Sequence, residues 1–239
     1  MTKQPIRFRT FPGLMAPVIT MIAMIAIMTI STTRHTAANE APQNKTTHIV
    51  ALGDSLTAGY MLPPGAGFPE QLTKALVAKG YSVKVTNAGV SGDTSSGGLA
   101  RLDWAMNPET DLLILELGSN DALRGIDPAV TRSNLGEIIT RAKAQGVHVL
   151  IAGMLAPPNM GEDYAADFNP IFEDLAREHK TALYPFFLDG VAANPDLNLA
   201  DGMHPTEEGV AIIVERILPT VETLINETQT ASQGSPAIN

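Results

Sequence analysis

The chain has 239 residues, of which 44% are hydrophobic and 17% charged, the composition of an ordinary globular domain. Its formal net charge is −9, and the still more negative charge that remains without residues 1–38 disfavours nucleic acid and anionic membrane surfaces as partners. Cysteine is absent, which excludes disulfides, thiolate catalysis and cysteine-ligated metal.

The first 38 residues have the composition of an export leader. A basic start precedes a largely apolar stretch over residues 11–30, and small residues close the segment. This pattern predicts a secretory signal peptide over residues 1–38, but the apolar stretch also has the length of an N-terminal membrane anchor. We therefore expect a periplasmic or secreted protein, with an inner-membrane-anchored form as the alternative. Without its first 38 residues the chain has 12 basic and 25 acidic side chains, a net charge of −13.

After a polar spacer over residues 39–46, short apolar runs alternate with amphipathic segments. The runs predicted as strands are 48–52, 82–85, 112–117, 147–152 and 182–187. Several are apolar at nearly every position, which is typical of strands buried on both faces of a sheet.

Helical patterns occupy the gaps between these runs. Asp127 and Pro128 can begin a helix that Gly146 ends. Its inward stripe is predicted to be Val130, Leu135, Ile138, Ile139 and Ala142. Further helices are predicted over 69–79, over 164–180 and after Thr206, where Pro219 should end or kink the helix. Residues 226–239 are predicted to be a disordered polar tail.

This alternation predicts a single α/β domain over residues 47–225, a three-layer α/β/α sandwich around a parallel sheet. In such a sheet, ligands bind in the crevice at the carboxyl ends of the strands. Polar groups follow four of the predicted strands at that edge. They are Ser55 after the first strand, Gly92 after the second, Asn120 after the third, and Asp201 and His204 between the fifth strand and the last helix.

These five residues have the chemistry that acyl transfer from an ester requires. A serine hydroxyl is a poor nucleophile until a base accepts its proton, and His204 is the candidate base for Ser55. Asp201 lies three residues earlier and can hold the imidazole in the required tautomer. The backbone N–H groups of Gly92 and Ser55 and the side-chain amide of Asn120 can stabilise an oxyanion.

Each residue also has a purely structural interpretation. The Gly-Asp-Ser sequence at 53–55 is common in turns, and Asn120 can cap the segment that follows it. Asp201 and His204 can form a surface pair at the start of the last helix. Gly92 alone indicates only a loop position that needs a positive φ. Four such coincidences in order along one rim favour catalysis. Asp54 is expected to hydrogen-bond loop backbone and not to act as a second catalytic acid.

The same residues resemble the four blocks of the SGNH, or GDSL-type, hydrolases. GDSLTAGY contains Ser55, SGDTSSGG contains Gly92, LELGSND contains Asn120 and DGMHP contains Asp201 and His204. The resemblance covers about residues 47–224. It implies a flavodoxin-like fold and ester hydrolysis, most closely that of bacterial arylesterases and thioesterase/lysophospholipases. Ser119 is a departure, because many relatives have glycine before the asparagine.

Residues after the fourth predicted strand have two interpretations. Met154, Leu155, Met160 and Phe168 either line an acyl pocket beside Ser55 or pack only in the core. The expected substrates are small acyl esters with an apolar acyl or aryl part, and the resemblance extends them to thioesters and lysophospholipids.

Neither cofactor nor metal is expected, because the mechanism needs no cofactor and no histidine has ligand-like spacing. An envelope carbohydrate O-acetylesterase is an alternative with the same chemistry. A non-catalytic flavodoxin-like nucleotide-binding module is disfavoured, since three aspartates at the crevice would repel a phosphate. An inactive scaffold protein is disfavoured because no catalytic position is missing.

Overall fold

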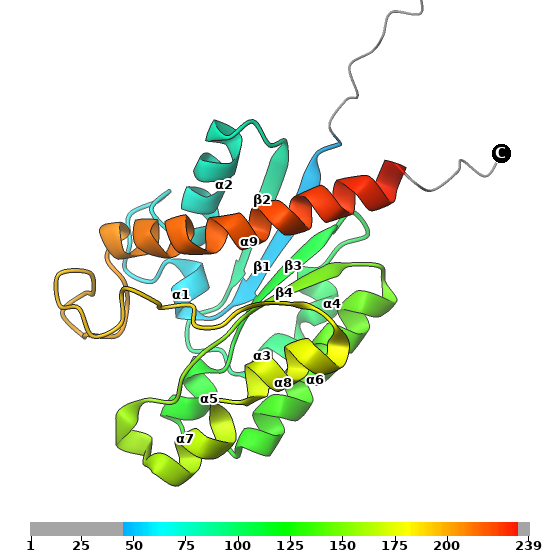
Figure 1. Ribbon diagram of the computed structural model, residues 1–239. Coiled ribbons are helices and arrows are strands. Elements are labelled where there is room, and N and C mark those ends of the chain that lie inside the picture. The colour runs from blue at the N-terminus through cyan, green and yellow to red at the C-terminus, as the bar shows by residue number, and fades with distance from the viewer. Residues whose placement is uncertain (1–44, 234–239) are drawn as a thin grey trace, which may run out of the picture. The chain divides into compact units, whose positions relative to one another are not determined.

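The computed structural model describes residues 45–233, so the predicted leader, most of the spacer and the last six residues lie outside the described part. In that part, five strands form one parallel sheet in the order β2-β1-β3-β4-β5 (Figure 1). The strands are β1 (Thr47–Gly53), β2 (Val83–Gly89), β3 (Leu112–Glu116), β4 (His148–Ala152) and β5 (Ala182–Tyr184). The predicted three-layer parallel sandwich is confirmed.

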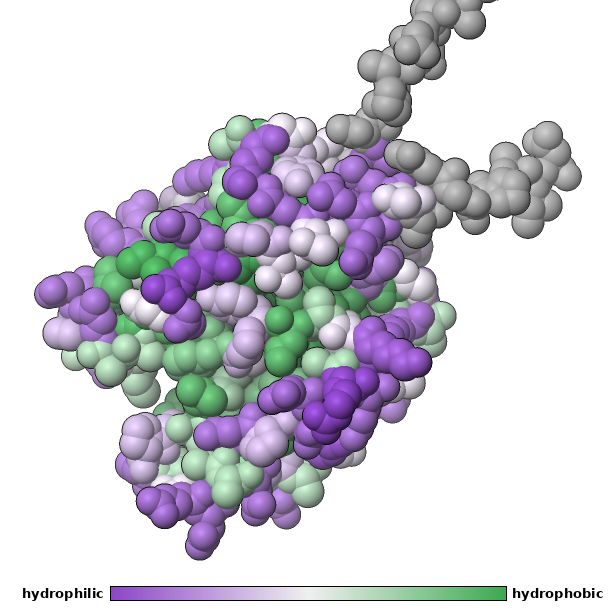
Figure 2. All heavy atoms as spheres, in the orientation of Figure 1, coloured by the Kyte–Doolittle hydropathy of each residue, from purple (hydrophilic) through white to green (hydrophobic). Residues whose placement is uncertain are grey.

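Helices cover both faces of the sheet. α2 (Phe68–Ala78) and α9 (Glu207–Gln233) pack against each other on one face, whereas α3 (Ser95–Ala100), α6 (Pro128–Ala144) and α8 (Ile171–His179) cover the other (Figure 1). The shorter helices are α1 (Ser55–Ala58), α4 (Leu102–Ala105), α5 (Ser119–Leu123), η1 (Pro158–Met160) and α7 (Glu162–Phe168). Figure 2 shows polar residues over much of the outer surface of α9 and α8, with apolar residues visible between them.

The central strands are apolar because both of their faces are covered. Every residue of β3 is buried, as is β1 from Ile49 onward. A side chain pointing to either face of these strands meets a helix layer instead of water, which is why no alternation of polar and apolar residues is seen.

The predicted beginning of α6 is confirmed, and so is its inward stripe except at Val130. Asp127 caps the helix by accepting the N–H of Ala129 at 2.8 Å, and Pro128 is its first residue. Val130 is 42% exposed, so its predicted inward position is wrong. The neighbouring Thr131 is buried in its place, because its hydroxyl donates to the buried carboxylate of Asp121 at 3.0 Å.

Two prolines in helical segments have different effects, because Pro170 interrupts a predicted helix whereas Pro219 does not end one. The single helix predicted over 164–180 is two helices, α7 and α8, which are interrupted at Pro170, the N-cap of α8. Proline has no N–H to donate to the preceding turn, so a break there is favoured. Pro219 instead lies inside α9 and does not end it.

The predicted tail over residues 226–239 also needs correction, because α9 continues to Gln233. Ile225 is fully buried, and the Gln229 side chain donates to Thr47 Oγ1 at 3.4 Å, which joins this last part of the helix to the start of β1. Only residues 234–239 of the predicted tail lie outside the described part. Within residues 45–233, no helix has both the length and the apolar character needed to cross a membrane.

Candidate active site

Ser55 is the first residue of α1 and lies two residues after Gly53, the last residue of β1. Asp54 is the N-cap of this short helix, and its Oδ1 accepts the N–H of Leu56 at 2.9 Å. N–H groups in the first turn of a helix have no partner within the helix. The backbone N–H of Ser55 is therefore left free by the helix and can donate to a ligand, on the same residue that carries the candidate nucleophilic hydroxyl.

Ser55, His204 and Asp201 form a continuous hydrogen-bonded series. His204 Nε2 lies 2.9 Å from Ser55 Oγ, and His204 Nδ1 lies 2.7 Å from Asp201 Oδ2. The other carboxylate oxygen of Asp201 accepts the N–H groups of Met203 and His204 at 2.9 and 3.0 Å. These two backbone bonds, followed by the bond from the imidazole, lower the pKa of Asp201 to about 2.

The ionised carboxylate fixes which imidazole nitrogen carries the proton. Because Asp201 can only accept, the proton of a neutral His204 belongs on Nδ1, and Nε2 is then an acceptor facing Ser55. Tyr60 packs against the same ring, with 4.5 Å between ring centroids and a tilt of 41°. The sequence analysis missed Tyr60, although it stands five residues after Ser55 in the same motif.

Three donors face the space beside Ser55. Within residues 45–233, neither the backbone N–H of Ser55 nor that of Gly92 donates a hydrogen bond. Gly92 has a φ of +82°, and its carbonyl accepts from Arg124 at 2.6 Å. Asn120 Nδ2 donates to Asp54 Oδ2 at 2.9 Å, which turns the nitrogen and not the oxygen of this amide toward the site.

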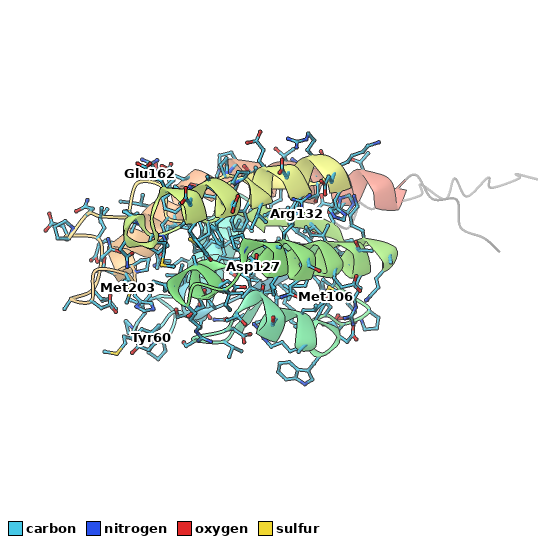
Figure 3. All side chains as sticks on the ribbon, turned by 90° about the horizontal axis from the view of Figure 1, so that it is seen from below. Tyr60, Met106, Asp127, Arg132, Glu162 and Met203 are labelled. Atoms are coloured by element: carbon cyan, nitrogen blue, oxygen red, sulfur yellow. The ribbon has the colours of Figure 1, made fainter. Side chains whose placement is uncertain are left out.

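A cavity of about 720 Å³ opens on these donors and contains Ser55, Gly92, Asn120 and His204 in its wall. The rest of the wall is mainly apolar and includes Leu123, Met154, Leu155, Phe186, Leu188 and Met203. Figure 3 shows two of its wall residues, Tyr60 and Met203, at the same end of the domain. A hollow of about 820 Å³ at the amino ends of β4 and β5 contains none of the candidate catalytic residues.

Only two of the four predicted pocket residues line this cavity. Met154 and Leu155 are in its wall, but Met160 and Phe168 are not. Phe168 is fully buried and stacks on Tyr164, with 5.7 Å between ring centroids. The pocket interpretation of Met160 and Phe168 is therefore wrong, because the segment that follows β4 contributes to the cavity wall only as far as Pro158.

Two carboxyl groups are buried beneath the nucleophile. Asp54 and Glu116 are both fully buried, and Glu116 Oε2 accepts from Thr57 Oγ1 at 2.8 Å. Burial raises the pKa of Asp54, and burial followed by the charge of Asp54 raises the pKa of Glu116. The Ser119 hydroxyl also donates to Asp54, so the departure from glycine at 119 adds a hydrogen bond. Glu116 was missed by the sequence analysis, although a glutamate ending an apolar run is a recognisable signal.

In this site a serine hydroxyl is hydrogen-bonded to an imidazole, and the imidazole is hydrogen-bonded to a carboxylate. Together with N–H donors beside the serine, this is the arrangement of a serine hydrolase. The sequence model of the GDSL-like lipase/acylhydrolase family matches residues 51–212, and the chain belongs to this family. The matched range includes Ser55, Gly92, Asn120, Asp201 and His204.

Characterised relatives cover most of the described domain. Esterase TesA of Pseudomonas aeruginosa is 40% identical over 178 residues, which is 74% of this chain and 89% of that protein. An arylesterase of Vibrio mimicus is 41% identical over 168 residues, 70% of this chain and 84% of that protein. Thioesterase 1/protease 1/lysophospholipase L1 of Escherichia coli is 35% identical over 179 residues, 74% of this chain and 85% of that protein.

The fold is also similar to that of a solved esterase. The crystal structure of TesA superimposes with a TM-score of 0.71 at 40% identity and covers 74% of this chain and 99% of that one. Similarity of this extent agrees with the parallel sheet described above.

Proposed function

We propose that this serine ester hydrolase cleaves carboxylic esters through an acyl-enzyme on Ser55. The observation that carries the proposal is the 2.9 Å contact between Ser55 Oγ and His204 Nε2, continued by the 2.7 Å contact from His204 Nδ1 to Asp201. The family relation and the names of the relatives support the same reaction class.

In the first half of the reaction, Ser55 Oγ attacks the ester carbonyl carbon while His204 Nε2 takes the hydroxyl proton. The electron pair of the carbonyl moves onto its oxygen, which receives hydrogen bonds from the N–H groups of Ser55 and Gly92 and from Asn120 Nδ2. The imidazolium then gives its proton to the alkoxy oxygen as the C–O bond breaks. An alcohol leaves, and the acyl group remains on Ser55.

In the second half, water replaces the alcohol. His204 Nε2 takes a proton from the water as its oxygen attacks the acyl carbon, and the same donors hold the oxyanion. The bond from carbon to Ser55 Oγ breaks, and the proton returns from the imidazolium to that oxygen. Asp201 stays ionised at neutral pH and stabilises the imidazolium in both halves.

The wall of the cavity supports substrates with an apolar acyl or aryl part. Leu155, Phe186 and Leu188 offer contact area and no hydrogen bonds, so burial of methylene groups supplies the binding energy there. Thioesters and lysophospholipids are proposed from the name of the Escherichia coli relative. A carbohydrate O-acetylesterase is a weaker candidate, because a sugar needs polar partners that this wall largely lacks.

A cell-envelope location is proposed from the composition of residues 1–38, which lie outside the described part. Mass spectrometry of the protein recovered from fractionated cells tests this. A mature chain that begins near residue 39 and is released with the periplasm is expected, whereas a full-length chain in the membrane fraction would favour the anchored form.

The proposed reaction is tested with Ser55→Ala and a panel of p-nitrophenyl esters of graded acyl length, run beside an acyl thioester and an acetylated sugar. Turnover of the esters should fall to background in this variant at an unchanged melting temperature. Ser82→Ala is the matched control, because among residues 45–233 Ser82 hydrogen-bonds to Thr46 and to the N–H of Thr47, at the amino ends of the strands and away from the candidate site. Wild-type hydrolysis by Ser55→Ala would remove the proposal.

A further inference from the structure

Glu116 is a buried carboxyl group that the reaction above does not use. We propose that Glu116 is a positioning residue, which ties the first turn of α1 to the end of β3 so that the backbone N–H of Ser55 is kept for the substrate oxyanion. This inference deepens the proposed function and rests on it, because the N–H that is held in place matters only if Ser55 is the nucleophile.

Packing alone does not explain a glutamate at this place. β3 consists of four aliphatic residues, Leu112 to Leu115, and then Glu116, and all five are buried. A carboxyl group withdrawn from water is unfavourable unless it is hydrogen-bonded, and an aliphatic residue would fill the same strand position without that cost. The contacts of the carboxyl must therefore account for its presence.

Those contacts lead directly to the nucleophile loop. Glu116 Oε2 accepts the Thr57 hydroxyl at 2.8 Å and the backbone N–H of Asp54 at 3.3 Å. On the other side of Ser55, the N–H of Leu56 donates to Asp54 Oδ1 at 2.9 Å. The N–H groups before and after Ser55 thus each have a carboxyl acceptor, whereas the N–H of Ser55 has no acceptor within residues 45–233.

The space for this contact is provided by Gly53. Gly53 is the register partner of Glu116 across β1 and β3. A Cβ at position 53 would lie 2.6 Å from Glu116 Oε2 and 2.0 Å from Thr57 Oγ1. Both distances are too short for a non-bonded contact of a Cβ atom. The contact between Thr57 and Glu116 therefore requires glycine at position 53, because any larger residue there would occupy the space of their side chains.

The surroundings of the Glu116 carboxyl favour its neutral form. Burial, followed by the charge of Asp54, raises the pKa of Glu116 well above its ordinary value. Asp54 is the charged group that faces it, and Glu116 Oε1 has no hydrogen-bond partner in the described part of the chain. A neutral group supplies the acceptor for Thr57 and Asp54 without adding a second negative charge beneath the site where the oxyanion develops. Glutamine is neutral and has the same shape, so Glu116→Gln should keep the contacts with Thr57 and Asp54.

The test compares Glu116→Gln with Glu116→Leu in steady-state hydrolysis of p-nitrophenyl acetate and in the rate of inactivation by an organophosphonate. Glu116→Leu should lose about 10²-fold in kcat and a similar factor in inactivation rate, with KM nearly unchanged, because a misaligned oxyanion donor acts only in the transition state. Glu116→Gln should stay within about fivefold of wild type in both. Leu113→Val, a destabilising change in the middle of the same strand, is the control and should leave both rates unchanged.

Thr57→Val removes one partner of the same contact without changing β3, so it replaces Glu116→Leu if that variant does not fold. Wild-type kcat in folded Glu116→Leu, or in Thr57→Val should the leucine variant be unfolded, would overturn the proposal. So would a loss in Glu116→Gln as large as that in Glu116→Leu. Turnover by wild type and its absence in Ser55→Ala are measured in parallel, so failure of the positioning role is distinguished from failure of the serine mechanism.

Discussion

Replacement of Asp201 by asparagine tests how the imidazole of His204 is held. Asp201 accepts two backbone N–H groups through Oδ1 and the imidazole N–H through Oδ2. Asparagine has one oxygen, and that oxygen is retained by the two backbone donors. Its NH₂ group then faces His204 Nδ1, which must become an acceptor, so the ring proton moves to Nε2.

An imidazole protonated on Nε2 donates to Ser55 Oγ and cannot take its proton. We expect kcat of Asp201→Asn to fall by about 10³–10⁴, equivalent to about 4–5.5 kcal/mol in the barrier at 1.36 kcal/mol for each factor of ten. KM should change little, because Asp201 is not part of the cavity wall. The assay is hydrolysis of p-nitrophenyl acetate at pH 7 to 8, with circular dichroism to verify folding.

Asp189→Asn is the matched control for this substitution. Asp189 is exposed, pairs with Arg216 and lies outside the cavity wall, so its loss should leave kcat unchanged. A kcat for folded Asp201→Asn within tenfold of wild type would refute the argument from the tautomer of His204.

Three further predictions follow from the same contacts. Asn120→Ala should lower kcat by about 10²–10³ through loss of one oxyanion donor; in steady-state kinetics, an effect on KM alone would deny Asn120 that role. Leu155→Ser should lower kcat/KM for an octanoate ester at least about tenfold more than for an acetate ester, since each buried methylene contributes about 0.8 kcal/mol; equal losses would place the acyl chain elsewhere. Because the raised pKa of Glu116 lets the folded state bind the proton more tightly than the unfolded state, wild type should lose stability relative to Glu116→Gln as the pH rises above the ordinary value of 4.5. Urea unfolding at pH 4 and pH 8 measures this, and a difference that does not vary with pH would contradict it.

The parts of the fold that follow from local pattern were predictable from sequence. Strands such as β3 are buried on both faces and read as continuous apolar runs, and the carboxyl ends of parallel strands share one edge. These two rules were enough to bring Ser55, Asn120 and His204 to one rim, although 149 positions separate the serine from the histidine.

The parts that depend on packing between distant segments were not predictable. The polar end of α9 reads as a tail until the contact of Gln229 with Thr47 is known. Phe168 is a large apolar residue of the kind that lines ligand pockets. Only its contacts with Tyr164 and Phe172 show that it belongs to the hydrophobic core. The partners of Glu116 are Thr57 of α1 and Asp54, the N-cap of that helix, which lie 59 and 62 positions earlier, so its role could not be inferred from its neighbours in sequence.

Mass spectrometry of the protein after reaction with an organophosphonate ester tests the central claim most directly. The reagent mimics the tetrahedral intermediate, so one equivalent should be bound covalently, with loss of hydrolysis in proportion, and peptide mapping should locate it on Ser55. Ser55→Ala should remain unlabelled under the same conditions. Labelling of a different residue with parallel loss of activity, or continued hydrolysis by fully labelled protein, would contradict the account.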